Sequence, residues 1–167
     1  INSNGSRKYD CDTLYLALKN KASTETMALL LDQGCEAVND NPSELQKTLN
    51  SAIGYKASLK TLGLLLDRGA EIVNETLDAD GNPDYSLNTL TFALQYASEK
   101  TEEIVALLLE RGAEIVNDDL NSDTNRSYYY HALNLALRKN LSEEIIDTLL
   151  VHGANPSFLE QNNPRRS

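Results

Sequence analysis

"LLLERGAEIVND", residues 107–118, repeats almost letter for letter an earlier phrase, "LLLDRGAEIVNE" at residues 64–75. Ten of the twelve letters are identical, and the two differences only exchange Asp and Glu. Two fainter copies are "LLLDQGCEAVND" at residues 29–40 and "TLLVHGANPS" at residues 148–157. Every copy carries one glycine, and these are Gly34, Gly69, Gly112 and Gly153. Such internal self-similarity predicts a protein built from stacked repeats.

Each copy of the phrase is predicted to form the second half of a helix that ends at its glycine. Eleven places before each glycine stands a residue able to cap a helix, namely Ser23, Ser58, Thr101 and Ser142. Glycine can take the left-handed conformation that closes a helix. Further upstream, a leucine and an alanine three residues apart share one helical face in every repeat: Leu14 and Ala17, Leu49 and Ala52, Leu90 and Ala93, and Leu133 and Ala136. The sequence therefore predicts four helix pairs that bury their apolar faces by stacking.

This pattern resembles the ankyrin repeat, through the "LLL-x-x-GA" phrase and the Leu-x-x-Ala signature, over about residues 12–156. The first-helix motif of that family, T-P-L-H-x-A, is degraded to "CDTLYLA", "QKTLNSA", "LNTLTFA" and "YHALNLA", with Tyr15, Asn50, Thr91 and Asn134 in place of the histidine. The resemblance implies an all-α fold, an ankyrin-like α-solenoid of four helix pairs. One domain would hold repeats at about 12–40, 47–75, 88–118 and 131–157. Because the chain starts with Ile1, we expect a piece of a longer protein.

The segments after the second and third glycines are longer than the family pattern and are expected to project as loops or β-hairpin fingers. In the first finger, "EIVNETL" and "YSLNT" are predicted as strands around the turn "DADGNPD". Residues 36–46, 71–88 and 113–126 together hold twelve acidic residues and one basic residue, whereas the chain as a whole has a net charge of −10. This charge is either an ordinary solvated surface or an electrostatic lip that steers a basic partner.

Several function classes are disfavoured by composition. A net charge of −10 argues against a nucleic-acid binder, and no apolar run is long enough for membrane insertion. Cys11 and Cys35 are too few for a disulfide framework, so we expect an intracellular protein, cytoplasmic or nuclear. The sequence contains no recognisable catalytic or cofactor-binding motif, so neither an enzyme nor a cofactor is expected.

Two possible metal sites were weighed and are not expected. The acidic run that starts at Asp78 has its glycine at the fourth place and Thr89 at the twelfth, whereas a calcium-binding EF-hand loop needs glycine sixth and glutamate twelfth. His131 and His152 lack the clustered ligands of a zinc site. We interpret His152 as an exposed helix-end residue and His131 as part of the last finger.

Aromatic residues are the main candidates for partner binding. In each first helix, the positions one before and three after the repeat alanine should face the concave groove, which would unite Tyr55, Phe92 and Tyr96 in one patch. The fingers would add aromatic and acidic side chains, namely Tyr85, Tyr128, Tyr129, Tyr130, Asp78, Asp80, Asp84, Asp118 and Asp119. The alternative is that some of these tyrosines pack between fingers and helices.

The expected function is protein–protein interaction. A protein or peptide partner with basic and apolar features would bind the concave groove and the acidic, tyrosine-bearing fingers. The first alternative is a domain that recruits substrates for an enzyme located elsewhere in a longer chain, possibly an effector directed at a host cell. A spacer or a self-association module is the second alternative, and the oligomeric state stays open.

Overall fold

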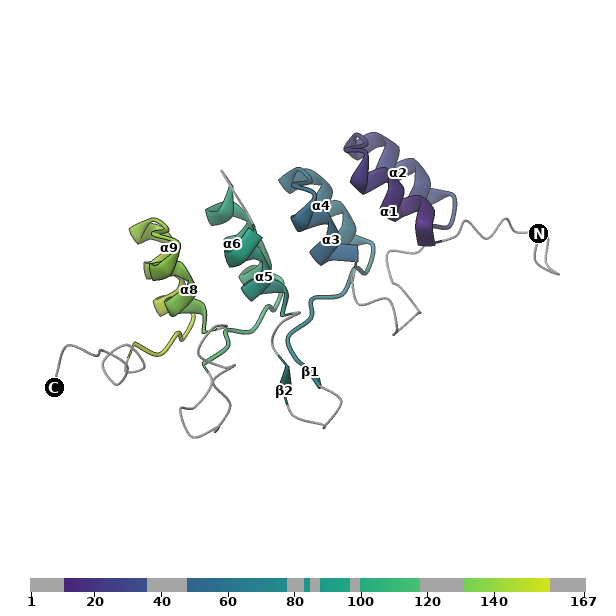
Figure 1. Ribbon diagram of the computed structural model, residues 1–167. Coiled ribbons are helices and arrows are strands. Elements are labelled where there is room, and N and C mark those ends of the chain that lie inside the picture. The colour runs from purple at the N-terminus through teal and green to yellow at the C-terminus, as the bar shows by residue number, and fades with distance from the viewer. Residues whose placement is uncertain are drawn as a thin grey trace, which may run out of the picture. The chain divides into compact units, whose positions relative to one another are not determined.

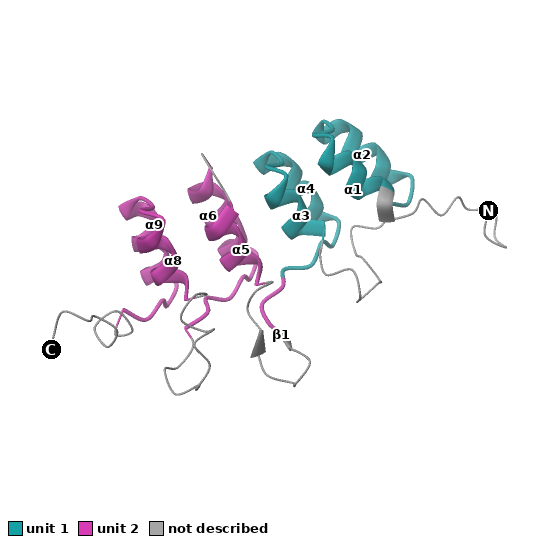
Figure 2. Ribbon diagram, in the orientation of Figure 1, with its two compact units in different colours: residues 1–72 teal, residues 73–167 magenta. Residues whose placement is uncertain are grey.

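The computed structural model describes residues 11–35, 48–77, 83–84, 88–96, 100–117 and 131–156. The chain divides into two compact units, Ile1–Ile72 and Val73–Ser167 (Figure 2). The eight helices within the described residues make its fold all-α (Figure 1). Each unit holds two of the predicted helix pairs.

The first unit consists of two helix pairs that pack side by side. Its helices are α1 (Cys11–Lys19), α2 (Thr24–Asp32), α3 (Thr48–Gly54) and α4 (Leu59–Asp67). The first helix of one pair packs against the first helix of the next, α1 on α3, and α2 packs in the same way on α4. This arrangement buries one face of every helix.

The second unit repeats that arrangement and adds a short strand pair. Its elements are β1 (Thr76–Leu77), β2 (Pro83–Asp84), α5 (Thr89–Tyr96), α6 (Thr101–Glu110), α8 (Ala132–Arg138) and α9 (Glu143–Val151). Helix α5 packs on α6 and α8, and α9 packs on α6 and α8. The strands pair antiparallel, Thr76 with Asp84 and Leu77 with Pro83. The second strand therefore starts inside the segment predicted as a turn, before the predicted strand "YSLNT".

The Leu-x-x-Ala signature lies in the core, as its spacing predicts. Leu14, Leu49, Leu90 and Leu133 are all buried, and so are the alanines of the last three repeats. The second helices contribute Leu65, Leu108 and Leu149. Burial of each leucine stabilises the fold by roughly 1.5–3 kcal/mol relative to exposure.

The glycine stops are confirmed. Gly34, Gly69, Gly112 and Gly153 have φ between 89° and 97°. At the first of them the amide of Cys35 donates to the Leu30 carbonyl and the amide of Gly34 to the Leu31 carbonyl. This is the Schellman arrangement, which satisfies carbonyls that the helix end leaves open.

Three of the four predicted helix caps are confirmed. The hydroxyls of Ser23, Ser58 and Ser142 accept from the third amide of their helices. Thr101 as a cap is wrong, because it is already the first residue of α6, and Lys100 at the cap position makes no side-chain cap bond. The three capping serines follow their repeat alanine by six residues, whereas Thr101 follows by eight. Helix α6 begins eleven residues before its repeat glycine, and the other second helices begin ten residues before theirs.

The turn inside three of the helix pairs carries a left-handed residue that is not glycine. Lys21, Lys56 and Asn140 have φ of 56°, 59° and 52°. Each follows its repeat alanine by four residues, and the next amide donates to the carbonyl of that alanine. The first helices of these three pairs, α1, α3 and α8, therefore end as the second helices do, but with a side chain in a conformation that L-residues disfavour.

Candidate functional site

Helix α5 carries an aromatic pair at its exposed end. The rings of Phe92 and Tyr96 lie 4.5 Å apart between centroids with an interplanar angle of 38°. They are four residues apart on one helix, so they share a face. Phe92 is half-buried, whereas Tyr96 is 54% exposed, which is high for a large aromatic side chain. The pair offers an apolar surface that includes the exposed ring of Tyr96.

Tyr55 has a partner that the sequence did not suggest. Its hydroxyl lies 2.6 Å from the Tyr15 hydroxyl, and the two rings meet edge to face at 5.6 Å. This hydrogen bond is the main reason that the pKa of the Tyr55 phenol is raised. Tyr55 therefore joins α1 to the end of α3 inside the first unit. The predicted alternative, that some tyrosines pack between fingers and helices, is a different arrangement and stays a prediction.

The predicted union of Tyr55 with Phe92 and Tyr96 stays a prediction. Tyr55 lies in the first unit and the other two residues in the second. The residue one before the repeat alanine was predicted to face the groove, but its exposure differs between repeats. Leu16 is half exposed, whereas Ser51 and Leu135 are buried. This position lies at the edge of the apolar stripe of the first helix, where a neighbouring segment of the same protein can cover it.

The base of the first finger is fixed to the start of α5. The Val73 amide donates to the Thr89 hydroxyl at 2.9 Å, and the Thr89 amide donates back to the Val73 carbonyl at 2.8 Å. The Asn88 side-chain amide donates to the Asn74 carbonyl at 2.8 Å, and its oxygen accepts from the Thr91 amide. Asn88 is also buried. It thus caps α5 and closes the finger at the same time, one turn before Phe92.

Most of the predicted finger residues lie outside the described part of the chain. These are Tyr85, Tyr128, Tyr129, Tyr130, Asp78, Asp80, Asp118 and Asp119. For Asp84 the structure gives the backbone, within β2. Their role in binding therefore stays a prediction.

The two histidines occupy different environments. His131 is 1% exposed at the start of α8, so its expected place on the last finger is wrong. Burial lowers the pKa of its imidazole. His152 is exposed at the end of α9, as predicted, with its Nδ1 2.8 Å from the Thr148 carbonyl. Within the described residues, no three His, Cys, Asp or Glu side chains are placed to share a metal ion.

Two asparagines of the second unit, each five places after a repeat glycine, bind the backbone beside the next repeat glycine. The Asn74 side chain donates to the Gly112 carbonyl and accepts from the Glu114 amide. Asn117 does the same with the Gly153 carbonyl at 2.7 Å and the Asn155 amide at 2.9 Å. Asn74 and Asn117 are not among the predicted site residues, although asparagine stands five places after the first three glycines. That spacing was the available signal.

No family model and no curated protein matches this chain. Within the described residues, none of the helices has both the length and the apolar character that crossing a bilayer requires.

Proposed function

We propose that this chain is a protein-interaction module of the ankyrin-repeat type, with its four helix pairs stacked in one solenoid. Two features support the stack. Helix pairs pack first helix on first helix and second on second within each unit, and in the second unit the Asn117 side chain joins the third repeat to the fourth. Stacked repeats of this kind present extended surfaces to partners.

The single observation that carries the binding function is the Phe92–Tyr96 pair. Tyr96 is exposed beside a second aromatic ring, and aromatic side chains are enriched among the residues that dominate binding energy. Because Asn88 fixes the start of α5 to the finger base, the pair is held in place before a partner arrives. Less conformational entropy is then lost on binding.

The acidic fingers define the chemistry of the partner. Residues 71–88 and 113–126 contain nine acidic residues and one basic residue. Opposite charge on a partner would speed the encounter, and apolar contacts with Phe92 and Tyr96 would then hold it. The proposed partner is a protein segment with both basic and apolar side chains.

A phage-displayed peptide selection on the intact chain tests this proposal. We expect enriched peptides to combine Lys or Arg with apolar residues, and their affinity to fall about thirtyfold in Tyr96→Ala, as for a hot-spot aromatic residue. Val151→Ala is the matched control, because Val151 is a more exposed apolar residue on α9. Equal affinity for the original chain and Tyr96→Ala would refute the proposed site. Affinity that does not fall with added salt would refute the role of the fingers.

A further inference from the structure

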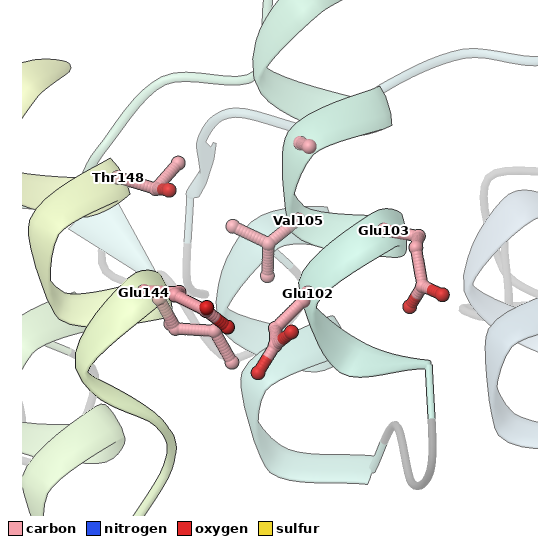
Figure 3. Close-up of a pocket in the computed structure, with 7 residues that line it drawn as sticks. Glu102, Glu103, Val105, Glu144 and Thr148 are labelled. Carbon is pink, nitrogen blue, oxygen red and sulfur yellow. The ribbon is translucent and has the colours of Figure 1, made fainter.

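Three apolar positions recur on the side of each repeat that meets the next one, and we call them the forward face. They are the residue one after the repeat alanine and the residues seven and three before the repeat glycine. The first and third repeats have a following helix pair in their own unit. There these side chains are all buried, namely Leu18, Met27, Leu31, Leu94, Val105 and Leu109. Figure 3 shows one of them, Val105 of α6, lying between α6 and α9.

The forward face of the fourth repeat is apolar but uncovered. Leu137 is 46% exposed, Leu150 is 39% exposed and Ile146 is half-buried. In the described part of the chain no helix pair follows α9. A terminal repeat needs a polar outer face to stay soluble on its own. Three apolar side chains at these positions therefore indicate that another helix pair covers this face.

The first repeat exposes the opposite surface, which we call the rear face. It is formed by the residues one before the repeat alanine and five before the repeat glycine, here Leu16 and Leu29, which are 50% and 64% exposed. The second and fourth repeats have a preceding helix pair in their own unit. Their side chains at these positions are buried or half-buried, namely Ser51, Leu64, Leu135 and Thr148. No helix pair precedes α1 among the described residues.

A polar contact at the join between the third and fourth repeats also has both its halves at these two ends. Glu102, ten residues before its repeat glycine, accepts a hydrogen bond from the hydroxyl of Ser142, eleven residues before the next one. The residue that corresponds to Glu102 in the fourth repeat is Glu143, and the residue that corresponds to Ser142 in the first repeat is Ser23. Both are exposed. The ends of the chain thus carry the acceptor and the donor of a contact that joins two repeats within it.

From this complementarity we infer that the chain binds a second copy of itself head to tail, with the forward face of the fourth repeat on the rear face of the first repeat of the other copy. First helices pack on first helices and second on second within each unit, so a rear face is the natural complement of a forward face. The contact uses a different patch on each copy and is therefore heterologous. One chain can then join a copy at each end.

The joint between copies should be weaker than the joint between repeats of one chain. Asn117 binds the backbone of the following repeat, whereas the residue five places after Gly153 is Phe158. No asparagine is therefore present to make that link at the end of the fourth repeat. The net charge of −10 on each copy also opposes association. We expect a reversible equilibrium that is separate from the proposed binding of a peptide partner.

Sedimentation velocity of the intact chain, from about 10 µM to about 1 mM, tests the inference over the range of weak association. The average sedimentation coefficient should rise with concentration and should not level off at the value of a dimer. Added salt should strengthen the association because it screens the repulsion between copies. This is the opposite of the salt effect expected for a basic partner. A chain that stays monomeric throughout would overturn the inference.

Two variants block one face each. Leu150→Lys alters the forward face and Leu29→Lys the rear face, and either should raise the Kd at least about tenfold because an ammonium would be buried against apolar side chains. A mixture of the two still offers one intact forward face and one intact rear face, so it should form a dimer that grows no further. Val151→Lys is the matched control, because the residue two before the repeat glycine is exposed in every repeat. It should associate as the original chain does.

The variants also distinguish other modes of association. Loss in Leu150→Lys with none in Leu29→Lys would assign the forward face to a symmetric contact between two fourth repeats. A mixture that does not dimerise, although circular dichroism shows that both variants fold, would exclude a head-to-tail contact. Self-association that disappears in Tyr96→Ala would place the contact at the aromatic pair. Each of these results would overturn the inference, whereas Tyr96→Ala that loses only peptide binding would leave it supported.

Discussion

Glycine to alanine substitutions at two positions of one repeat should have opposite effects on stability. Gly63 lies inside α4, and Gly69 ends that repeat with a φ of 89°. A Cβ at either position would meet no atom within 4 Å, so neither substitution creates a clash. The difference between them is therefore a matter of backbone conformation alone.

The magnitudes follow from that conformation. Gly63→Ala should raise the free energy of unfolding by about 1 kcal/mol, the difference in helix propensity between the two residues. Gly69→Ala places an L-residue in the left-handed region at a cost of roughly 1–2 kcal/mol. Alanine also reduces the conformational entropy of the unfolded chain, which raises the free energy of unfolding by about 0.4–1 kcal/mol. The net effect at Gly69 should be a loss of about 1 kcal/mol, and the two variants should differ by about 2 kcal/mol.

Urea unfolding followed by far-UV circular dichroism measures both free energies, and the slope of the transition should be unchanged. For a chain of this length the two melting temperatures should differ by about 4–8 °C. Shifts in the same direction would refute the reasoning. A stable Gly69→Ala variant would mean that the helix can end without a left-handed residue, and a destabilised Gly63→Ala variant would reveal a close approach to α4.

Three further predictions concern stability. Asn117→Ala removes two hydrogen bonds between repeats and should lower the free energy of unfolding, measured in urea, by about 1–2 kcal/mol. A change below about 0.5 kcal/mol would show that water replaces these hydrogen bonds at about equal energy. Lys56→Gly relieves a left-handed lysine and should raise the same free energy by roughly 0.5–1 kcal/mol; a loss of stability would contradict the strain. Burial lowers the pKa of His131, so the unfolded chain, with its histidine pKa near 6.5, binds the proton more tightly than the folded chain. Stability should be complete above about pH 6.5 and fall as the pH drops from there toward the lowered pKa, and His131→Gln should lose less stability over that window. Parallel pH profiles for the original chain and His131→Gln would contradict this.

The parts of the fold that could be predicted from the sequence are those set by neighbours along the chain. A cap, a leucine–alanine pair and a glycine stop all fall within one repeat, and the structure confirms them except at Thr101. The Tyr15–Tyr55 hydrogen bond joins residues 40 positions apart, and nothing within either repeat indicates it. The burial of His131 depends equally on how the chain packs around it. The predicted finger residues are not tested, because most of them lie outside the described structure.

One residue of the phrase "LLLERGAEIVND", Asn117, makes contacts that only the three-dimensional structure reveals. The leucines and the glycine of this phrase form and end a helix of their own repeat. Asn117 instead binds the backbone at Gly153 and Asn155 of the following repeat. Asn74 does the same across a finger segment of different length. Both asparagines bind the backbone beside the following repeat glycine, although the segments between the two partners differ in length. Longer loops add only a small, logarithmic entropic cost to closure. The asparagine can therefore make the same contact in both cases while the segments after it differ, which gives a reason for keeping this one residue of the phrase.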